Sequence, residues 1–252
     1  MDISYGQLDS DICKLHINED YIYKSYMIND EIAKRYGYRY SIDLARLSVM
    51  VYPYHPFDIL NICDRWHMWL WLYDDKIDNN NSDDRLISLM QDIMYDIKRI
   101  LTYNNYNHFK MMVDDYLSSL NMVGKYKDEY IPWRLRNSAC ETVFSLIVPN
   151  IDIDFNAKQH QRYVANYVCS ITNDIFSYDK EVKDGKEMDN YIYYITTPST
   201  SIEEIKSKLL DEVLNMINNF KVKDIYDKRL KIWMQENYIW HKTCKRYSYS
   251  RF

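Results

Sequence analysis

The chain has 252 residues, of which 47% are hydrophobic and 15% aromatic, and its formal net charge at pH 7 is −5. This is enough apolar material for one large core, so we expect a single domain over residues 1–252. The 32 Lys and Arg side chains are dispersed rather than gathered in a stripe, which argues against nucleic acid as a partner.

The amino-terminal segment and the cysteines indicate a cellular setting. The stretch MDISYGQLDSDICKL is polar and acidic, and the longest strongly apolar stretch, MWLWLY, is too short to span a bilayer. The five cysteines are scattered and include no C-x-x-C pair, so neither a disulfide framework nor a thiolate metal site is predicted. We therefore expect a soluble, cytoplasmic protein with no membrane span.

The first half of the chain contains two clear helix signals. Only four glycines and five prolines occur in the whole sequence, which favours long helices over many strands joined by tight turns. The two prolines of VYPYHPFD (51–58) predict a turn, followed by a long helix through NICDRWHMWLWLYDDKID (61–78). NNNSDD (79–84) ends this helix, and Ser82 is a candidate N-cap for the next one.

The second half continues the helical pattern. Residues 130–147 predict a helix that is entered or interrupted near Pro132, and residues 160–185 predict a helix that ends at its final glycine. The S-x-E-E signature predicts a further helix start between Ser199 and Ser201. The last predicted helix covers about 228–247. With eight to ten helices and no convincing strand, the sequence predicts an all-α fold.

A row of carboxylates ends the helix at 61–78. Asp74 and Asp78 are four residues apart and share one helix face, where they repel each other unless a cation lies between them. Asp75 lies beside them. A solvated acidic helix end would explain the same residues, but the apolar run WLWLY comes directly before them. An EF-hand loop does not fit, because no glycine occupies its sixth position.

A second row of oxygen donors occurs on the helix at 160–185. Asn173, Ser177 and Glu181 are four residues apart each time and therefore lie on one face. Oxygen ligands of mixed charge suit Mg²⁺, a hard ion that substrate phosphates usually help to coordinate. A polar stripe on an amphipathic helix is the simpler alternative. The presence of two such rows in one chain is the stronger signal.

These motifs resemble those of the microbial class I terpene synthases. The D-D-x-x-D helix end, the N-D-x-x-S-x-x-x-E row at 173–181 and the Arg246–Tyr247 pair 73 residues after Asn173 follow that family in order and spacing. The resemblance extends over most of the chain. Segments 52–78, 129–141 and 189–195 are similar to the approach to the aspartate motif, the diphosphate-sensing segment and the start of the following helix, respectively.

The resemblance implies a single helical-bundle class I terpenoid synthase fold with a central active-site cavity. That cavity would bind a linear prenyl diphosphate, and small single-domain relatives mostly take farnesyl diphosphate. The implied reaction releases diphosphate and forms a cyclic sesquiterpene hydrocarbon or alcohol. Three Mg²⁺ ions are expected, with Mn²⁺ as an alternative, and the protein would act as a monomer or a homodimer.

The resemblance also assigns metal ligands. Asp74 would bridge two ions with Asp75 or Asp78 in support, and the third ion would bind Asn173, Ser177 and Glu181.

A set of cationic and hydroxyl side chains would bind the diphosphate: Arg134 or Arg136, Lys180, Arg246 and Tyr247. Arg134 and Arg136 lie about 200° apart on a helix, so only one of them can point inward. We favour Arg134, because the family places residues similar to Tyr130 and Glu141 around it. Together with Asp74, the candidate catalytic residues are Arg134, Arg246 and Tyr247.

The carbocation formed by ionisation requires an apolar, water-poor cavity lined with aromatic faces. His67, Leu70 and Trp71 share a helix face with Asp74, and Trp240 lies two turns before Tyr247 on the last helix. These are the candidate pocket residues, although packing in the core is the alternative for each of them.

Two other functions fit an all-α chain of this kind. A chain-elongating prenyl transferase normally has two D-D-x-x-D motifs, and residues 173–181 are not a second copy. A catalytically inactive binding or scaffold protein of the same fold would not need both rows of metal ligands. The sequence contains no H-E-x-x-H, P-loop, dinucleotide-binding or nucleophile-elbow motif.

Overall fold

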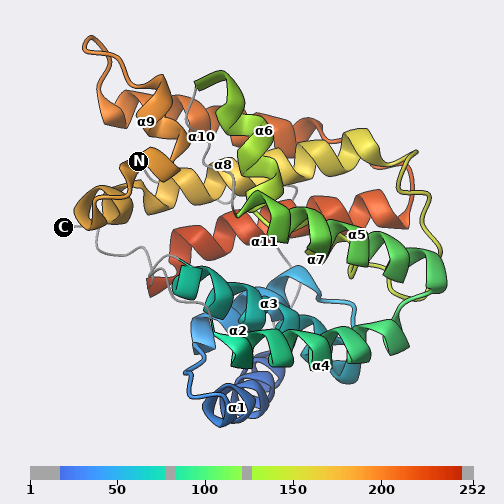
Figure 1. Ribbon diagram of the computed structural model, residues 1–252. Coiled ribbons are helices and arrows are strands. Elements are labelled where there is room, and N and C mark those ends of the chain that lie inside the picture. The colour runs from blue at the N-terminus through green and yellow to red at the C-terminus, as the bar shows by residue number, and fades with distance from the viewer. Residues whose placement is uncertain (1–17, 78–82, 121–126, 246–252) are drawn as a thin grey trace.

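A computed structural model describes residues 18–77, 83–120 and 127–245, and none of these residues forms a β-strand (Figure 1). The helices of the first half are α1 (Glu19–Arg35), α2 (Ile42–Val51), α3 (Phe57–Ile77), α4 (Asp84–Ile100) and α5 (Tyr103–Ser119). Those of the second half are α6 (Lys127–Asn137), α7 (Cys140–Phe144), α8 (Gln159–Asp184), the 3₁₀ turn η2 (Glu187–Asp189), α9 (Tyr191–Ile195), α10 (Ile202–Asn219) and α11 (Ile225–Thr243). The predicted all-α fold is confirmed.

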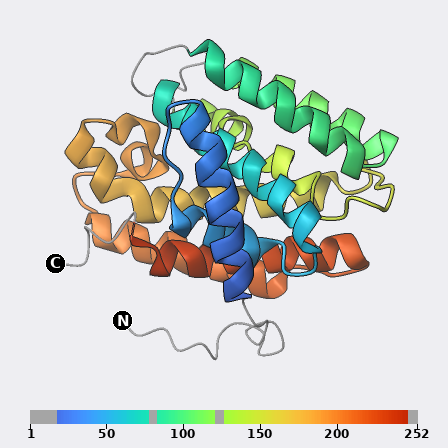
Figure 2. The same ribbon diagram turned by 90° about the horizontal axis from the view of Figure 1, so that it is seen from below.

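The two longest helices of the second half, α8 and α11, pack along each other through the middle of the molecule (Figure 1). α10 packs on α8, whereas α2 packs on α11. α1 and α3 both contact α2. Seen from below, α1 crosses the front of this arrangement and α4 and α5 lie along one side (Figure 2). None of the described helices is both long and apolar enough to cross a membrane.

Two of the predicted helix boundaries are confirmed by their caps. α8 ends at Gly185, whose φ of 70° is the left-handed conformation that glycine adopts without steric cost. α10 begins after Ser201, whose side chain accepts a hydrogen bond from the Glu204 N–H while the Glu204 carboxylate accepts one from the Ser201 N–H. This is the capping box that the S-x-E-E signature predicted. The prediction that Ser82 caps α4 is wrong: the N-cap is Asp83, whose carboxylate accepts from the Arg85 N–H at 3.0 Å, and Ser82 itself lies outside the described residues.

The helix predicted at 130–147 is interrupted, but at residues 138–139 rather than near Pro132, which lies inside α6. The chain forms α6 up to Asn137 and α7 from Cys140, and Ala139 between them has a left-handed φ of 57°. Ser138 stabilises the break, because its hydroxyl donates to the Leu135 carbonyl and accepts from the Cys140 N–H. The joint places side chains of both helices on the cavity described below.

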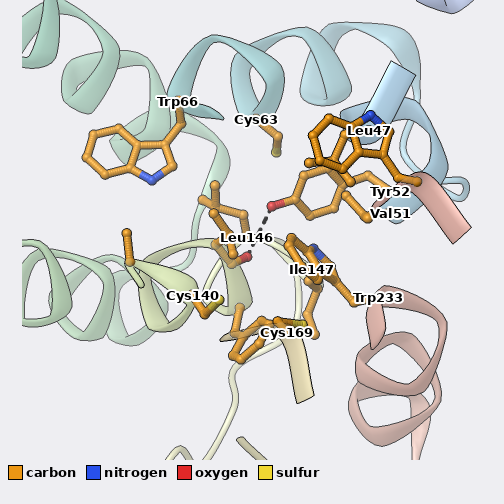
Figure 3. Packing of buried hydrophobic residues seen from close by; sticks show 14 of the residues in the cluster. Leu47, Val51, Tyr52, Cys63, Trp66, Cys140, Leu146, Ile147, Cys169 and Trp233 are labelled. Carbon is orange, nitrogen blue, oxygen red and sulfur yellow. Dashed lines mark hydrogen bonds between the residues drawn. The ribbon is translucent and has the colours of Figure 1, made fainter. Parts of the chain in front are cut away.

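Buried aromatic side chains of α3 form a core with residues of α4, α5 and α7. Trp66, Trp69 and Tyr73 stack in succession, with centroid separations of 4.9 Å and 4.7 Å. The Trp66 indole N–H donates to Thr142, and that of Trp69 donates to the Leu86 carbonyl. Figure 3 shows Trp66, with Cys63 and Tyr52, facing Cys140, Cys169 and Trp233 across the core.

A buried carboxylate ties α1 and the segment between α1 and α2 to α3. Asp64 is fully buried and accepts hydrogen bonds from Ser25 at 2.6 Å, Asn29 at 2.6 Å and Tyr40 at 2.5 Å. Three donors satisfy the charge without a cation, which is the condition under which a carboxylate is tolerated in a core. Ser25, Asn29 and Tyr40 thus fix α3, which carries the aspartates at its end.

We predict that Asp64→Ala lowers the free energy of unfolding by about 3 kcal/mol, because it leaves three buried donors without an acceptor. Ser25→Ala removes one of the three donors to Asp64 and the acceptor of the Asn61 amide, and it should cost about 1 kcal/mol. Urea unfolding followed by circular dichroism measures both values. Equal losses for the two variants would show that Asp64 does not organise the cluster.

Candidate active site

A cavity of about 150 Å³ lies between α3, the α6–α7 joint, α8 and α11. Its wall combines aromatic and aliphatic side chains with a few polar groups. The polar and charged residues used below come from four different helices: Asp74 on α3, Arg134 on α6, Asn173 on α8 and Asn237 and His241 on α11. Because the hydrogen-bonding side chains converge on one apolar hollow, this cavity is the candidate active site.

One face of α3 lines the cavity. His67, Leu70, Trp71 and Asp74 follow the spacing i, i+3, i+4 and i+7, and all four are on the cavity wall as predicted. Asp75 is exposed and does not line the cavity, and Asp78 lies outside the described residues.

The prediction that Trp240 lines the pocket is wrong. Trp240 is fully buried, and its indole N–H donates to the Asp43 carbonyl at 2.6 Å, which turns the ring toward α2. It therefore packs behind Trp71, with ring centroids 6.1 Å apart. Three other residues of α11, at i, i+4 and i+8, line the cavity in its place: Trp233, Asn237 and His241.

The three predicted ligands on α8 lie on one helix face as predicted from their spacing. Asn173 lines the cavity, and Ser177 and Glu181 continue the row one and two turns further on. The Asn190 amide donates to Glu181 Oε2 at 2.7 Å and lies 3.4 Å from Ser177 Oγ. A third contact, to the Asp174 carbonyl at 2.8 Å, fixes Asn190 against α8. Asn190 thus holds the last two oxygen donors next to each other.

The electrostatic environment of Glu181 is unfavourable to its charged form. Burial and, next, the charge of Asp174 raise the pKa of Glu181 to about 7, although Asn190, Ser177 and Arg134 partly counteract them. A carboxylate in this state gains most from a nearby cation.

Arg134 forms a buried ion pair beside this row. Its Nε and Nη2 lie 2.9 Å and 2.8 Å from Asp174 Oδ1, and Nη2 also donates to Asn173 Oδ1 at 2.8 Å. Asp174 Oδ2 accepts from the Tyr130 hydroxyl at 2.8 Å and the Tyr191 N–H at 3.0 Å. Burial opposes the charge on Arg134, but the charges of Asp174 and its neighbours outweigh it, so the pKa of the guanidinium is raised and the group stays cationic.

Arg136, the other candidate for diphosphate binding, does not line the cavity. Its Nε donates to Asp115 Oδ1 and its Nη2 to Ser118, both at 2.9 Å, so the side chain points to α5 and away from the cavity. Of the two arginines, only Arg134 lines the cavity. Lys180 is exposed and lies 3.2 Å from Asp184, and it is not on the cavity wall. Arg246 and Tyr247 lie outside the described residues.

His67 supplies a neutral polar group to the cavity wall. Burial lowers its pKa to about 3, so the imidazole is uncharged at physiological pH. Its Nδ1 lies 2.8 Å from Ser48 Oγ, and the edge of its ring faces Trp233.

Several residues that contact the predicted site were not found from the sequence: Asp174, Asn190, Tyr191 and His241. Asp174 follows Asn173 directly, and Asn190 caps α9 by accepting from the Ile192 N–H, so a cap signal was available for Asn190. His241 lies near the end of α11, and no sequence motif around it indicates a role in the site.

The donor set on α8 suits a hard divalent cation. It consists of an amide, a hydroxyl and a carboxylate oxygen, which are ligands of Mg²⁺ and Mn²⁺ rather than Zn²⁺. Within the described ranges, no group of three or more His, Cys, Asp or Glu side chains is arranged to hold a metal ion. The residues therefore fit an ion that is bound partly by uncharged oxygens.

Comparison with known proteins agrees with this site. The chain matches the model of terpene synthase family 2, C-terminal metal binding, over residues 63–218. It is 21% identical over 257 residues to terpene synthase 9 of Dictyostelium discoideum, covering 79% of this chain and 76% of that protein. It is 23% identical over 281 residues to terpene synthase 7 of the same organism, covering 89% and 82%.

Solved structures share the fold. Linalool/nerolidol synthase from Streptomyces clavuligerus, in complex with 2-fluorogeranyl diphosphate, has a TM-score of 0.71 and 13% identity, covering 92% of this chain and 95% of that chain. The SVS_A2 protein from ancestral sequence reconstruction has a TM-score of 0.67 and 15% identity, covering 88% and 85%. At these identities the likeness establishes the helical fold of the class I terpene synthases.

We predict that Glu181→Gln stabilises the metal-free protein at pH 8 by about 1 kcal/mol and has little effect near pH 5. The folded-state pKa of Glu181 lies above its unfolded value, so the carboxyl contributes least to stability once the pH exceeds about 7 and the group is ionised. Glutamine preserves an oxygen for Asn190 without the charge. Thermal unfolding at the two pH values measures the difference. A variant that is less stable than the wild type at pH 8 would contradict this electrostatic account.

Proposed function

The chain belongs to terpene synthase family 2 and is a class I terpene synthase; we propose that it is a Mg²⁺-dependent cyclase that converts farnesyl diphosphate to a cyclic sesquiterpene hydrocarbon or alcohol. The observation that carries the proposal is the convergence of Asp74, Arg134 and Asn173 on one cavity. These residues come from three helices far apart in sequence, and each has the chemistry to bind a metal ion or a diphosphate.

The substrate class follows from the charges around the cavity. A guanidinium beside a row of amide, hydroxyl and carboxylate oxygens suits an anionic diphosphate with its divalent ions, and the apolar wall suits a hydrocarbon chain. The solved linalool/nerolidol synthase holds a fluorinated geranyl diphosphate, which supports a prenyl diphosphate here. We propose the fifteen-carbon substrate from the resemblance to small single-domain relatives.

Metal binding would involve Asp74 on one side of the cavity and Asn173, Ser177 and Glu181 on the other. Bound Mg²⁺ would neutralise charge on the diphosphate leaving group. Arg134 would donate to diphosphate oxygens from its fixed position beside Asn173. In the first step the allylic carbon–oxygen bond breaks and both electrons leave with the diphosphate, so donors placed at these oxygens stabilise the charge that develops.

The rest of the cavity must protect the carbocation. Trp71, Trp233 and Tyr116 line the wall and offer aromatic faces, which attract a cation through their negative π-surfaces. His67 is on the same wall and is neutral, so it adds no repulsive charge. The apolar surroundings limit access of water until the rearranged cation either loses a proton, which gives a hydrocarbon, or adds one water molecule that then loses a proton, which gives an alcohol.

We predict that the purified protein releases cyclic C15 volatiles from farnesyl diphosphate in the presence of Mg²⁺. Parallel incubations with geranyl and geranylgeranyl diphosphates, followed by mass spectrometry, identify the preferred chain length. A sample with excess chelator is the control and should give no enzymatic product. No product from any of the three substrates would overturn the proposed activity and favour the binding or scaffold alternative. A further incubation with added isopentenyl diphosphate as the five-carbon acceptor that yields a longer linear diphosphate would indicate a prenyl transferase.

A matched pair of substitutions tests the diphosphate-binding role of Arg134. Arg134→Lys keeps a positive charge near the buried Asp174 but loses the planar fork that reaches two partners, so we predict that kcat falls about 10–100-fold. Arg136→Lys makes the same change on the α5 side and should alter kcat less than about threefold. Steady-state kinetics at saturating Mg²⁺ compares them. Similar decreases in kcat for both variants would contradict the proposed diphosphate-binding role of Arg134.

A further inference from the structure

The side-chain amide of Asn173 is held at both ends. Arg134 Nη2 donates to its oxygen at 2.8 Å, and its nitrogen lies 3.2 Å from His241 Nε2. These two partners come from α6 and α11, the helices on either side of α8. α8 and α11 run side by side in Figure 1, and this contact lies near the end of α11.

The hydrogen-bond roles in this chain follow from its last member. His241 Nδ1 lies 2.8 Å from the Asn237 carbonyl, which can only accept, so Nδ1 carries the proton. In the neutral imidazole, His241 Nε2 is then the acceptor nitrogen, and it accepts from the Asn173 amide nitrogen. A rotated Asn173 amide would place its N–H₂ against the Arg134 guanidinium and its oxygen against the His241 electron pair, which are both repulsive.

The imidazole itself cannot turn freely. His241 is 3% exposed, its ring lies edge-to-face with Trp240 at 4.9 Å, and Phe176 packs on it at 6.0 Å. A packed ring with a fixed proton is a rigid acceptor. Since an amide oxygen has two electron pairs, Asn173 Oδ1 can accept from Arg134 and still present one pair to a cation.

We propose that His241 is a positioning residue for the metal site: it orients the Asn173 amide so that the oxygen, not the nitrogen, faces the bound cation. This rests on the proposed function, in which Asn173 is a metal ligand. A side chain that orients a ligand in this way typically contributes 10–100-fold to metal affinity. His241 also lines the cavity, but in this assignment it affects metal binding through Asn173.

The test compares variants that differ in their acceptor atom. His241→Phe keeps a packed ring but removes the acceptor, whereas His241→Gln restores an oxygen acceptor near the position of Nε2. His241→Met is a second variant without a suitable acceptor in case the phenyl ring prevents folding. His108→Phe is the matched control, because His108 is another buried histidine, bonded to Ser145 and stacked on Phe155, that does not line the cavity.

The first measurement needs no turnover. The thermal midpoint is recorded as Mg²⁺ is titrated at a fixed concentration of inorganic pyrophosphate, which reports metal binding by linkage. We expect His241→Phe to raise the half-saturating Mg²⁺ concentration about tenfold or more and His241→Gln to keep it within about threefold of the wild type. His108→Phe should lower the midpoint without changing the Mg²⁺ dependence.

A double variant shows whether His241 acts through Asn173. If it does, His241→Phe should shift the half-saturating Mg²⁺ concentration no further in an Asn173→Ala background than Asn173→Ala alone. Additive shifts, or equal shifts for His241→Phe and His241→Gln, would overturn the positioning role while leaving the proposed function intact. A wild-type protein that shows no response to Mg²⁺ and pyrophosphate would overturn both proposals.

Discussion

The buried ion pair between Arg134 and Asp174 determines where α6 lies against α8. A charge moved out of water is costly, and an ion pair offsets that cost only when its remaining donors and acceptors are also satisfied. Here the second carboxylate oxygen accepts from Tyr130 and from the Tyr191 N–H, so α6, α8 and α9 meet at one carboxylate. As a result, the guanidinium reaches Asn173 as well, and a strong cation is held beside the row of oxygen donors.

Hydrogen bonds from other segments stabilise the row of polar side chains on α8, Asn173, Ser177 and Glu181, when no metal ion is bound. Asn173 is held between Arg134 and His241, and Ser177 and Glu181 share the amide of Asn190. Each of these three side chains is therefore hydrogen-bonded by a residue from another segment of the chain. The residues that contact them are neutral or, in the case of Arg134, positively charged. The raised pKa of Glu181 shows that these partners compensate burial only in part. Residual strain of this kind is typical of sites that are arranged for a ligand rather than for stability.

Helical spacing was sufficient to predict which residues share a helix face. His67, Leu70, Trp71 and Asp74 line the cavity because the period of an α-helix leaves little freedom once the helix is formed. The capping box at Ser201 and the left-handed Gly185 were predictable for the same reason, since both depend on residues within one turn.

The predictions that are wrong depend on tertiary contacts, which cannot be predicted from the spacing of residues along a helix. Trp240 is within reach of the cavity by spacing, but a hydrogen bond to Asp43, almost 200 positions away, turns the indole toward α2. The break after α6 was missed because it uses Ala139 in a conformation usually given to glycine, stabilised by the Ser138 hydroxyl.

His241 illustrates the general limit most clearly. Its proton position is set by a carbonyl on its own helix, whereas its partner is an amide 68 residues earlier, so no local pattern marks it. What distinguishes it is the sequence of donors and acceptors from Asn237 through His241 and Asn173 to Arg134, which has only one consistent direction. This series of hydrogen bonds fixes the orientation of each side chain in it and moves no charge. The amide of Asn173 is therefore held in one orientation before any ligand arrives, and this would lower the entropic cost of the proposed cation binding.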